Sequence, residues 1–199
     1  MLITRNETLI NAQVYTSAAT VNFSMNDFDQ GSVHLVCVDA TPAVKTFTDT
    51  DVTVLANTVT IAAHGFFTGL KVVTTTSGAA PGGLAAGTWY IIVVNSSTIK
   101  FADSLAKALA NNAADITTAG GVGDTQTITP AALGTCAIDL YGSNTDTDFV
   151  TLSVGTGNFT AGTLKLLPIV DKFYKNLQLV MTVPAGALKV TATVYGKQY

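Results

Sequence analysis

The stretch "ALKVTATVYG" at residues 187–196 alternates apolar side chains with polar or aromatic ones. Its apolar residues Leu188, Val190, Ala192 and Val194 share one face, and a period of two is typical of a strand that buries one side. Three stretches repeat the pattern, with Val33, Leu35 and Cys37 in "SVHLVCVDA", Cys136, Ile138 and Leu140 in "CAIDLYG", and Leu177, Leu179, Met181 and Val183 in "KNLQLVMTV". The sequence therefore predicts four half-buried strands.

Turn-forming residues separate these strands. The clusters "GSNTDTD" at 142–148, "GTGN" at 155–158 and "PAGA" at 184–187 gather Gly, Asn, Asp and Pro, which favour tight turns. Their spacing along the chain is typical of a β-sandwich or a β-barrel.

A single stretch predicts a helix. "DSLAKALANN" begins with Asp103 or Ser104 as its N-cap and places Leu105, Ala106 and Leu109 at helical spacing. The stretch is long enough for about two turns. We therefore expect an all-β protein with one short helix.

The middle of the chain differs from its two ends. Between about Asp49 and Thr129 the strand-like stretches become short and closely spaced, and the proline-containing segments "DATPAVKT" and "TPAALGT" flank this region. Neither outer piece alone supplies enough strands to close a core. We expect a discontinuous β-sandwich from residues 1–46 and 131–199, interrupted by an inserted small β module at 47–130.

The composition argues against two classes of partner. Charged residues are 12% of the chain, against roughly 25% in ordinary soluble proteins, and the formal net charge is −3 with no basic run. Nucleic-acid binding needs clustered Lys and Arg, so we expect no nucleic-acid partner. The longest apolar runs, such as "YIIVV" at 90–94, fall far short of the roughly 20 residues of a membrane span, so we expect no membrane partner.

The sequence also gives expectations about compartment and thiols. The start "MLITRNETLINAQ" lacks the pattern of a secretion signal, so we expect folding in a cytoplasm. Cys37 and Cys136 are too few for a disulfide scaffold and have no CxxC spacing, which favours two buried thiols. Whether the two are spatial neighbours stays open.

No stretch carries a complete catalytic, cofactor-binding or metal-binding pattern, and we expect no enzyme activity and no cofactor. His64 lies in "HGFFTG", where a His-Gly pair favours a turn, and His34 lies alone in a strand. "SLAK" at 104–107 matches the Ser-x-x-Lys pattern of serine β-lactamases without their other motifs, which favours a helix cap.

Two loops resemble ligand-binding loops, one for calcium and one for phosphate, but neither has the complete pattern of residues. "SNTDTDF" places Asn144, Asp146 and Asp148 at alternate positions as a calcium loop does, but the expected Gly and Glu are missing. The glycines at 120, 121 and 123 follow no buried strand and open no helix, so they do not indicate a phosphate-binding loop.

The central stretch, from "NTVTIAAHGFFTGLKVV" through "GTWYIIVVNSSTIKFADSLAKAL" to "ADITTAGGVGDTQTIT", carries ordered motifs. They are a His-Gly-Phe turn, "L-x-x-G-T-x-Y", "S-T-I-K-F-A", "S-L-A-x-A-L" and "D-I-T-x-A-G". In this order they resemble a small β module of tailed-bacteriophage structural proteins, which is similar to a domain of ubiquitin-activating enzymes. No activity follows from that resemblance.

The outer pieces resemble a second family. "AIDLYGSNTDTDFVTLSV", "AGTLKLLPIVDKFYKNLQLVMTV" and "ALKVTATVYG" are similar to the jelly-roll cement proteins that decorate the capsids of some podovirus-like phages, including those of Bordetella. The resemblance implies a jelly-roll β-sandwich, a virion location on the outer capsid surface, and a structural role in stabilising a capsid by bridging its subunits. It also implies the major capsid protein as partner and a homo-oligomer, dimer or trimer, with the inserted module projecting outward.

We expect the shell contact on the outer domain. Phe173, Tyr174 and Tyr195 are candidate interface aromatics, although each equally suits core packing. The first 20 residues, "MLITRNETLINAQVYTSAAT", are expected to run as an arm over a neighbouring molecule.

Two other functions remain as alternatives. One is a tail, baseplate or head-fibre component that contacts the host surface. The other is a carbohydrate-binding module, which needs an exposed aromatic platform, whereas Trp89 alternates with Ile91 and Val93 on an apparently inward face.

Overall fold

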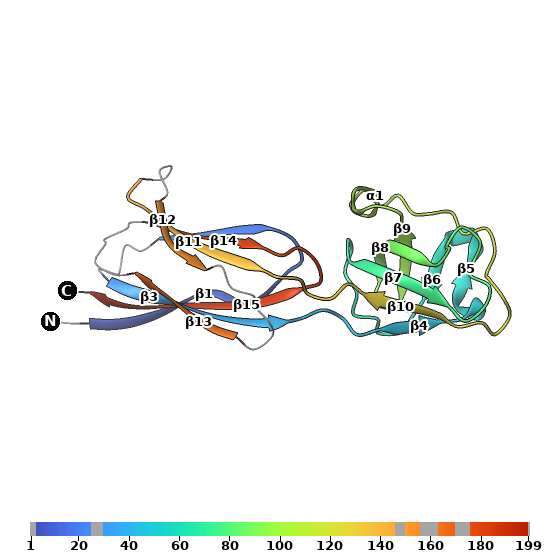
Figure 1. Cartoon of the computed structure of the whole chain (residues 1–199), viewed down its shortest axis with the longest axis horizontal. Coiled ribbons are helices and arrows are strands. Elements are labelled where there is room, and N and C mark those ends of the chain that lie inside the picture. The colour runs from blue at the N-terminus through green and yellow to red at the C-terminus, as the bar shows by residue number, and fades with distance from the viewer. Residues whose placement is uncertain (1–2, 25–29, 146–149, 156–162, 170–175, 199) are drawn as a thin grey trace. The chain divides into compact units, whose positions relative to one another are not determined.

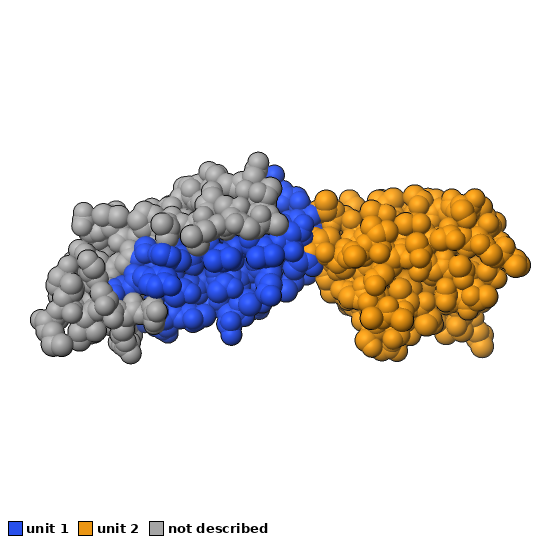
Figure 2. Space-filling view, turned by 90° about the horizontal axis from the view of Figure 1, so that it is seen from below, with its two compact units in different colours: residues 1–40, 133–199 blue, residues 41–132 orange. Residues whose placement is uncertain are grey.

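The computed structural model describes residues 3–24, 30–145, 150–155, 163–169 and 176–198. The chain forms two compact units, Met1–Ala40 with Leu133–Tyr199 (unit 1) and Thr41–Ala132 (unit 2), coloured separately in Figure 2. Unit 2 therefore begins before the expected boundary at residue 47. The reason is a short strand, β4 (Lys45–Phe47), which pairs with β10 (Gln126–Pro130) of the same unit.

Unit 1 consists of two antiparallel sheets (Figure 1). Sheet A has the order β1-β15-β3-β13, and sheet B has the order β12-β11-β14-β2. The strands are β1 (Ile3–Tyr15), β2 (Ala19–Ser24), β3 (Gln30–Asp39), β11 (Ala137–Ser143), β12 (Val150–Gly155), β13 (Thr163–Ile169), β14 (Asn176–Thr182) and β15 (Leu188–Gln198).

The pairing of these strands is nested. β1 pairs with β15, β2 with β14, β3 with β13 and β11 with β12, so the first strand of the unit meets its last and each inner pair follows in turn. A long antiparallel hairpin folded over into two sheets in this way is a jelly roll. The predicted all-β, jelly-roll-like sandwich is confirmed.

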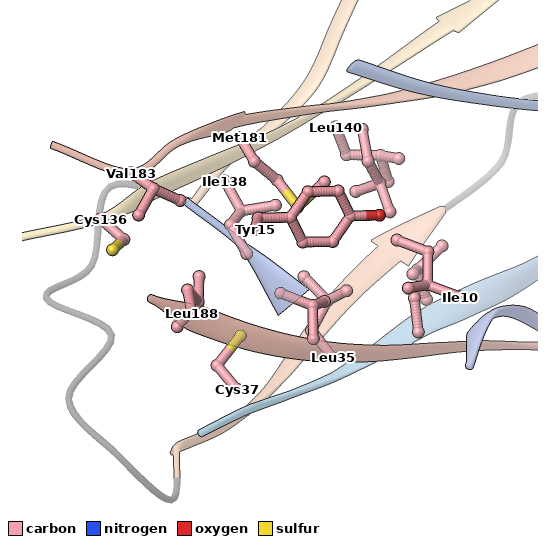
Figure 3. Close-up of a cluster of buried hydrophobic side chains, with 14 of the residues drawn as sticks. Ile10, Tyr15, Leu35, Cys37, Cys136, Ile138, Leu140, Met181, Val183 and Leu188 are labelled. Carbon is pink, nitrogen blue, oxygen red and sulfur yellow. The ribbon is translucent and has the colours of Figure 1, made fainter. Parts of the chain in front are cut away.

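Every residue that the four alternating stretches predict to face inward is buried, with at most 5% of its surface exposed. In Figure 3, Ile138 and Met181 of sheet B lie opposite Leu35 and Leu188 of sheet A, with the Tyr15 ring among them. Burial of such side chains stabilises a fold by roughly 1.5–3 kcal/mol each, which makes this core the main source of stability of unit 1.

The prediction that the N-terminal residues form an arm over a neighbouring molecule is wrong for the residues that the structure describes. Residues 3–15 form β1, which pairs along β15 within the same unit and buries Ile10 and Tyr15. The register of β1 shifts between Thr8 and Ile10 and again between Ile10 and Gln13. These irregularities break the period-two pattern, so the pattern of apolar residues does not predict β1.

Unit 2 is built on one seven-stranded antiparallel sheet of order β4-β10-β7-β8-β9-β6-β5. Its further elements are η1 (Asp49–Asp51), β5 (Val52–Thr53), η2 (Val54–Ala56), β6 (Thr58–Thr60), β7 (Lys71–Thr76), β8 (Gly87–Asn95), β9 (Thr98–Ala102) and α1 (Leu105–Leu109). The two edge strands are joined through the short η1, so the sheet must curl until its edges approach. The Phe47 ring of β4 accordingly lies 6.3 Å from the Phe101 ring of β9.

The predicted helix forms as α1. Ser104 is its N-cap, and its side chain accepts a hydrogen bond from the Lys107 N–H at 3.3 Å. The side that packs inward carries Ala108, which clusters with Ile92 and Ala102. Leu105 and Leu109 are 45% and 66% exposed, because a helix of one turn approaches the sheet closely through small residues. No helix among the described residues is long and apolar enough to cross a membrane.

The chain leaves and re-enters unit 1 at neighbouring points. At the exit, the Ala40 N–H donates to the Ala187 carbonyl at 2.8 Å. At the return, Gly134 lies so close to Pro184 that an added Cβ would come within 2.8 Å of its ring. Both contacts fall on the turn between β14 and β15, so an inserted domain at this place need not separate the strands of unit 1.

Candidate interaction surface

Sheet A turns one side toward the core and the other outward. The residues that alternate with the buried positions of β3 and β15, together with Val14 of β1, define what we call the outer face. Its members are Val14, Ser32, His34, Val36, Val38, Lys189, Thr191, Thr193 and Tyr195. Lys189 carries the one formal charge in this set, if His34 is neutral.

Valines dominate one end of the outer face. Val14, Val36 and Val38 are 48%, 42% and 42% exposed. Lys189 lies in register between Val14 of β1 and Val38 of β3, and Thr191 lies beside Val36. A strand face that meets only water usually carries polar side chains, so exposed valines in adjacent rows point to contact with protein.

The other end of the outer face carries an aromatic pair. The rings of His34 and Tyr195 have centroids 4.3 Å apart, and the His34 Nε2 atom lies 3.1 Å from the Ser32 Oγ atom. Tyr195 pairs with Ser32 across β15 and β3, so its contact with His34 is a diagonal cross-strand contact. Tyr195 remains 45% exposed and can contact a partner.

Of the three predicted interface aromatics, the structure places only Tyr195. Phe173 and Tyr174 lie outside the described residues. Sequence reasoning missed the valines of the outer face. The signal was present in "SVHLVCVDA", where Val36 and Val38 occupy the alternate positions that a water-facing strand fills with polar residues.

His64 is buried and both of its ring nitrogens are engaged. Its Nδ1 atom accepts a hydrogen bond from the Phe66 N–H at 2.9 Å, and its Nε2 atom lies 2.8 Å from the Asn95 carbonyl oxygen. A carbonyl can only accept, so the ring is the neutral Nε2–H tautomer. Gly65 beside it has a φ of 70°, the positive value that the His-Gly turn predicted. Through its hydrogen bond to Asn95, His64 holds this turn against the last residue of β8.

The Ser-x-x-Lys stretch is a helix cap. Lys107 Nζ lies 2.6 Å from Asp103 Oδ2. The hydrogen bond from Lys107 lowers the pKa of the Asp103 carboxyl, which is exposed to solvent. Ser104 meanwhile caps the helix backbone, so serine and lysine have separate structural partners.

The glycine-rich loop packs around a carboxylate. Asp124 accepts a hydrogen bond from the Ala79 N–H at 2.7 Å. A Cβ atom on either Gly78 or Gly121 would collide with the Asp124 side chain. These glycines therefore allow two loops of unit 2 to close on Asp124, which explains their frequency without a phosphate.

The other candidate ligands are resolved only in part. Asn144 of the calcium-like loop is described, whereas Asp146 and Asp148 lie outside the described residues. Within the described ranges no group of three or more His, Cys, Asp or Glu side chains is placed to hold a metal ion.

Trp89 packs toward the core of unit 2. Its ring meets Phe101 edge-on at 6.4 Å, and its Nε1–H donates to the Ala85 carbonyl at 2.9 Å. It joins the same cluster as Ile91 and Val93, as its alternation in the sequence predicts.

Cys37 and Cys136 are buried free thiols of the sandwich core (Figure 3). Burial, with a smaller effect of the negative charge of Asp39, raises the pKa of Cys136 above 9.0. A thiol held protonated in a core is a poor nucleophile.

No known family model and no curated protein matches the sequence. Among solved structures, the chain is similar to the VP16–VP17 complex, a complex of the two major capsid proteins of bacteriophage P23-77. The similarity covers 100% of this chain and 99% of that chain, at 10% sequence identity and a TM-score of 0.24. A TM-score of this size does not establish a common fold, and the jelly roll described above rests on its own strand pairing.

Proposed function

We propose that this protein is a structural component of a tailed-phage virion that decorates the capsid and stabilises it by bridging neighbouring capsid subunits. Unit 1 makes the contact with the major capsid protein through the outer face of sheet A. Unit 2 projects outward. The protein is made in the host cytoplasm and ends on the outer capsid surface.

The observation that carries the proposal is the chemistry of the outer face. Exposed valines supply apolar area, and the Tyr195–His34 pair supplies an aromatic group of the kind that anchors protein interfaces. The remaining members are mostly Thr and Ser, and covering neutral groups that can hydrogen-bond costs much less than covering ions. The face therefore suits a broad protein contact.

Repetition explains how a modest contact can stabilise a shell. Packaged DNA loads a capsid from within, and each bridge adds its interface free energy to the resistance of the whole lattice. An oligomer that presents the same face two or three times gains further through avidity. The fold, the resemblance of the outer sequence pieces to phage cement proteins and the outer face all support this role.

Binding to capsids tests the assignment and its site together. Purified protein is mixed with capsids of the encoding phage that lack it, and the bound fraction is measured by co-sedimentation. Val36→Lys with Val38→Lys places two charges on the outer face and is expected to weaken binding at least about tenfold. The matched control, Val73→Lys with Val94→Lys, changes two valines of unit 2 that are 43% and 51% exposed, and is expected to bind normally.

Two results would contradict the proposal. One is no binding of the unmodified protein to such capsids. The other is normal binding of the outer-face variant with loss in the unit 2 control, which would move the contact to the inserted module.

One observation favours the tail, baseplate or head-fibre alternative. Leu55, in the 3-10 helix η2, and Val122, in a turn of unit 2, are 99% and 94% exposed, and large apolar side chains in such positions suit contact with another surface. Under this alternative the protein is present in few copies per virion, whereas decoration of the whole capsid requires many.

A further inference from the structure

The strand β2 forms one edge of sheet B. It pairs with β14 in an unbroken antiparallel register, from Ala19 opposite Met181 to Ser24 opposite Asn176. No other strand in the described part of the chain pairs with it. Its outer side therefore presents backbone groups that can add a further strand.

The other sheet edges of the described chain carry features that discourage such pairing. β12, the opposite edge of sheet B, is also free of charge and proline, but its pairing with β11 is interrupted by a register shift between Leu140 and Tyr141. β1 has two register shifts and places Glu7 in register with the core residue Val194. β13 contains Pro168, and the edges of unit 2 are the short strands β4 and β5, of three and two residues. Short strands, proline, irregular register and charged side chains on the edge are the usual protections of an edge, and Glu7 is exposed. The sequence of β2, "ATVNFS", has no charge and no proline.

The core is also incompletely covered beside β2. The inward residues Ala19, Val21 and Phe23 pack against the sandwich core but are only half-buried, as is Leu9 of β1. The outward residues Thr20 and Asn22 are exposed. A strand added at this edge would cover apolar side chains on one face and meet neutral polar ones on the other.

We propose that β2 is a dimerisation edge, at which β2 of a second copy of this chain pairs antiparallel and extends sheet B through both molecules. The two-fold axis passes by Val21, so Val21 lies opposite Val21 of the second copy. Ala19 then lies opposite Phe23, and Thr20 opposite Asn22. Ser24, which already has a partner, stays outside the paired segment.

The absence of charge from β2 favours a second copy as the occupant. In a two-fold interface each residue near the axis meets itself or a near neighbour, so any charge there would face a like charge. The alternation of apolar and polar residues in β2 is also compatible with pairing to a second copy. Pairing about Val21 keeps apolar residues opposite apolar ones and polar residues opposite polar ones.

This inference is independent of the capsid assignment, because the isolated protein tests it. The molar mass is measured by sedimentation equilibrium over a range of concentrations. The protein is expected to dimerise, and Thr20→Lys with Asn22→Lys should weaken the dimer at least about tenfold, since two lysines then oppose each other on either side of the axis.

Two further variants separate pairing from a general effect of charge. Thr20→Lys with Asn22→Glu places opposite charges across the axis and should restore dimerisation. Thr75→Lys with Thr129→Lys adds the same charge to exposed threonines of unit 2 and should leave the dimer unchanged.

A cross-link tests the register. Directly opposite residues of antiparallel strands have Cα atoms about 4.5–5.5 Å apart, which a disulfide can span. Val21→Cys should give a covalent dimer on oxidation with diamide, whereas Val36→Cys, on the outer face, should not. The native thiols are buried and do not interfere.

A monomer at every concentration, or a trimer, would overturn the inference. So would a dimer of the Thr20→Lys, Asn22→Lys variant as tight as that of the unit 2 control.

Discussion

The imidazole of His34 and the phenol ring of Tyr195 lie with their centroids 4.3 Å apart, at an interplanar angle of 47°. One comes from β3 and the other from β15, two adjacent strands of sheet A that lie far apart in the sequence. The contact fixes the direction of a half-exposed tyrosine on the outer face. It links the strand pairing of the jelly roll to the surface that we assign to capsid binding.

The His34–Tyr195 contact should appear as a coupling energy. In a double-mutant cycle with His34→Ala and Tyr195→Ala, we expect about 0.5–1 kcal/mol of coupling in the free energy of unfolding, the range of exposed cross-strand aromatic pairs. Urea unfolding of unit 1 measures it. Strictly additive effects of the two substitutions would show that the rings do not stabilise each other.

His64 should matter for the stability of unit 2. His64→Ala leaves the Phe66 N–H and the Asn95 carbonyl without their partner, which we expect to cost about 2 kcal/mol or more. His64→Asn retains a side-chain acceptor near the Phe66 N–H and should cost less. Hydrogen exchange of unit 2 amides measures both changes. Equal protection in all three proteins would contradict this role.

The sandwich should lose stability in alkaline solution. Burial raises the pKa of Cys136 above 9.0 and that of Tyr15 above 10.0, so the folded state holds these protons more tightly than the unfolded state. Their contribution to stability is complete below pH 9 and is lost as pH rises through the folded pKa values. Urea unfolding at pH 7 and pH 10 measures the loss. Cys136→Ala should show a smaller difference between the two pH values than the unmodified protein.

Unit 1 should fold without unit 2. The exit at Ala40 and the return at Gly134 both lie against the turn between β14 and β15, so a short Gly/Ser link can replace residues 41–132. We expect the shortened protein to keep a β-rich circular dichroism spectrum and a cooperative unfolding transition. A shortened protein without cooperative unfolding would show that unit 2 is needed to complete the core of unit 1.

The elements that sequence predicted well are those whose pattern is local and regular. Residues such as Leu35, Ile138 and Val190 alternate with outward side chains along uninterrupted strands, and burial of one face imposes that alternation. The Ser104 cap and the turn at His64 also depend on residues close in the sequence.

The elements that sequence missed depend on contacts between distant residues. β1 is irregular at Ile10, and its pairing partner β15 lies at the other end of the chain. His64 is held by Asn95, a partner 31 residues away. Alternation shows which face is buried without showing that the other meets a partner. Val36 and Val38 are a local signal, but the outer face as a whole depends on the pairing of β1, β15 and β3, which are distant in the sequence.

The copy number of the protein in virions tests the account most directly. Quantitative mass spectrometry of purified virions of the encoding phage gives the ratio of this chain to the major capsid protein. We predict one copy per capsid subunit, or a simple fraction such as one third, as decoration of the whole lattice requires. A few to a few dozen copies per particle would contradict capsid decoration and place the protein at a vertex, neck or tail.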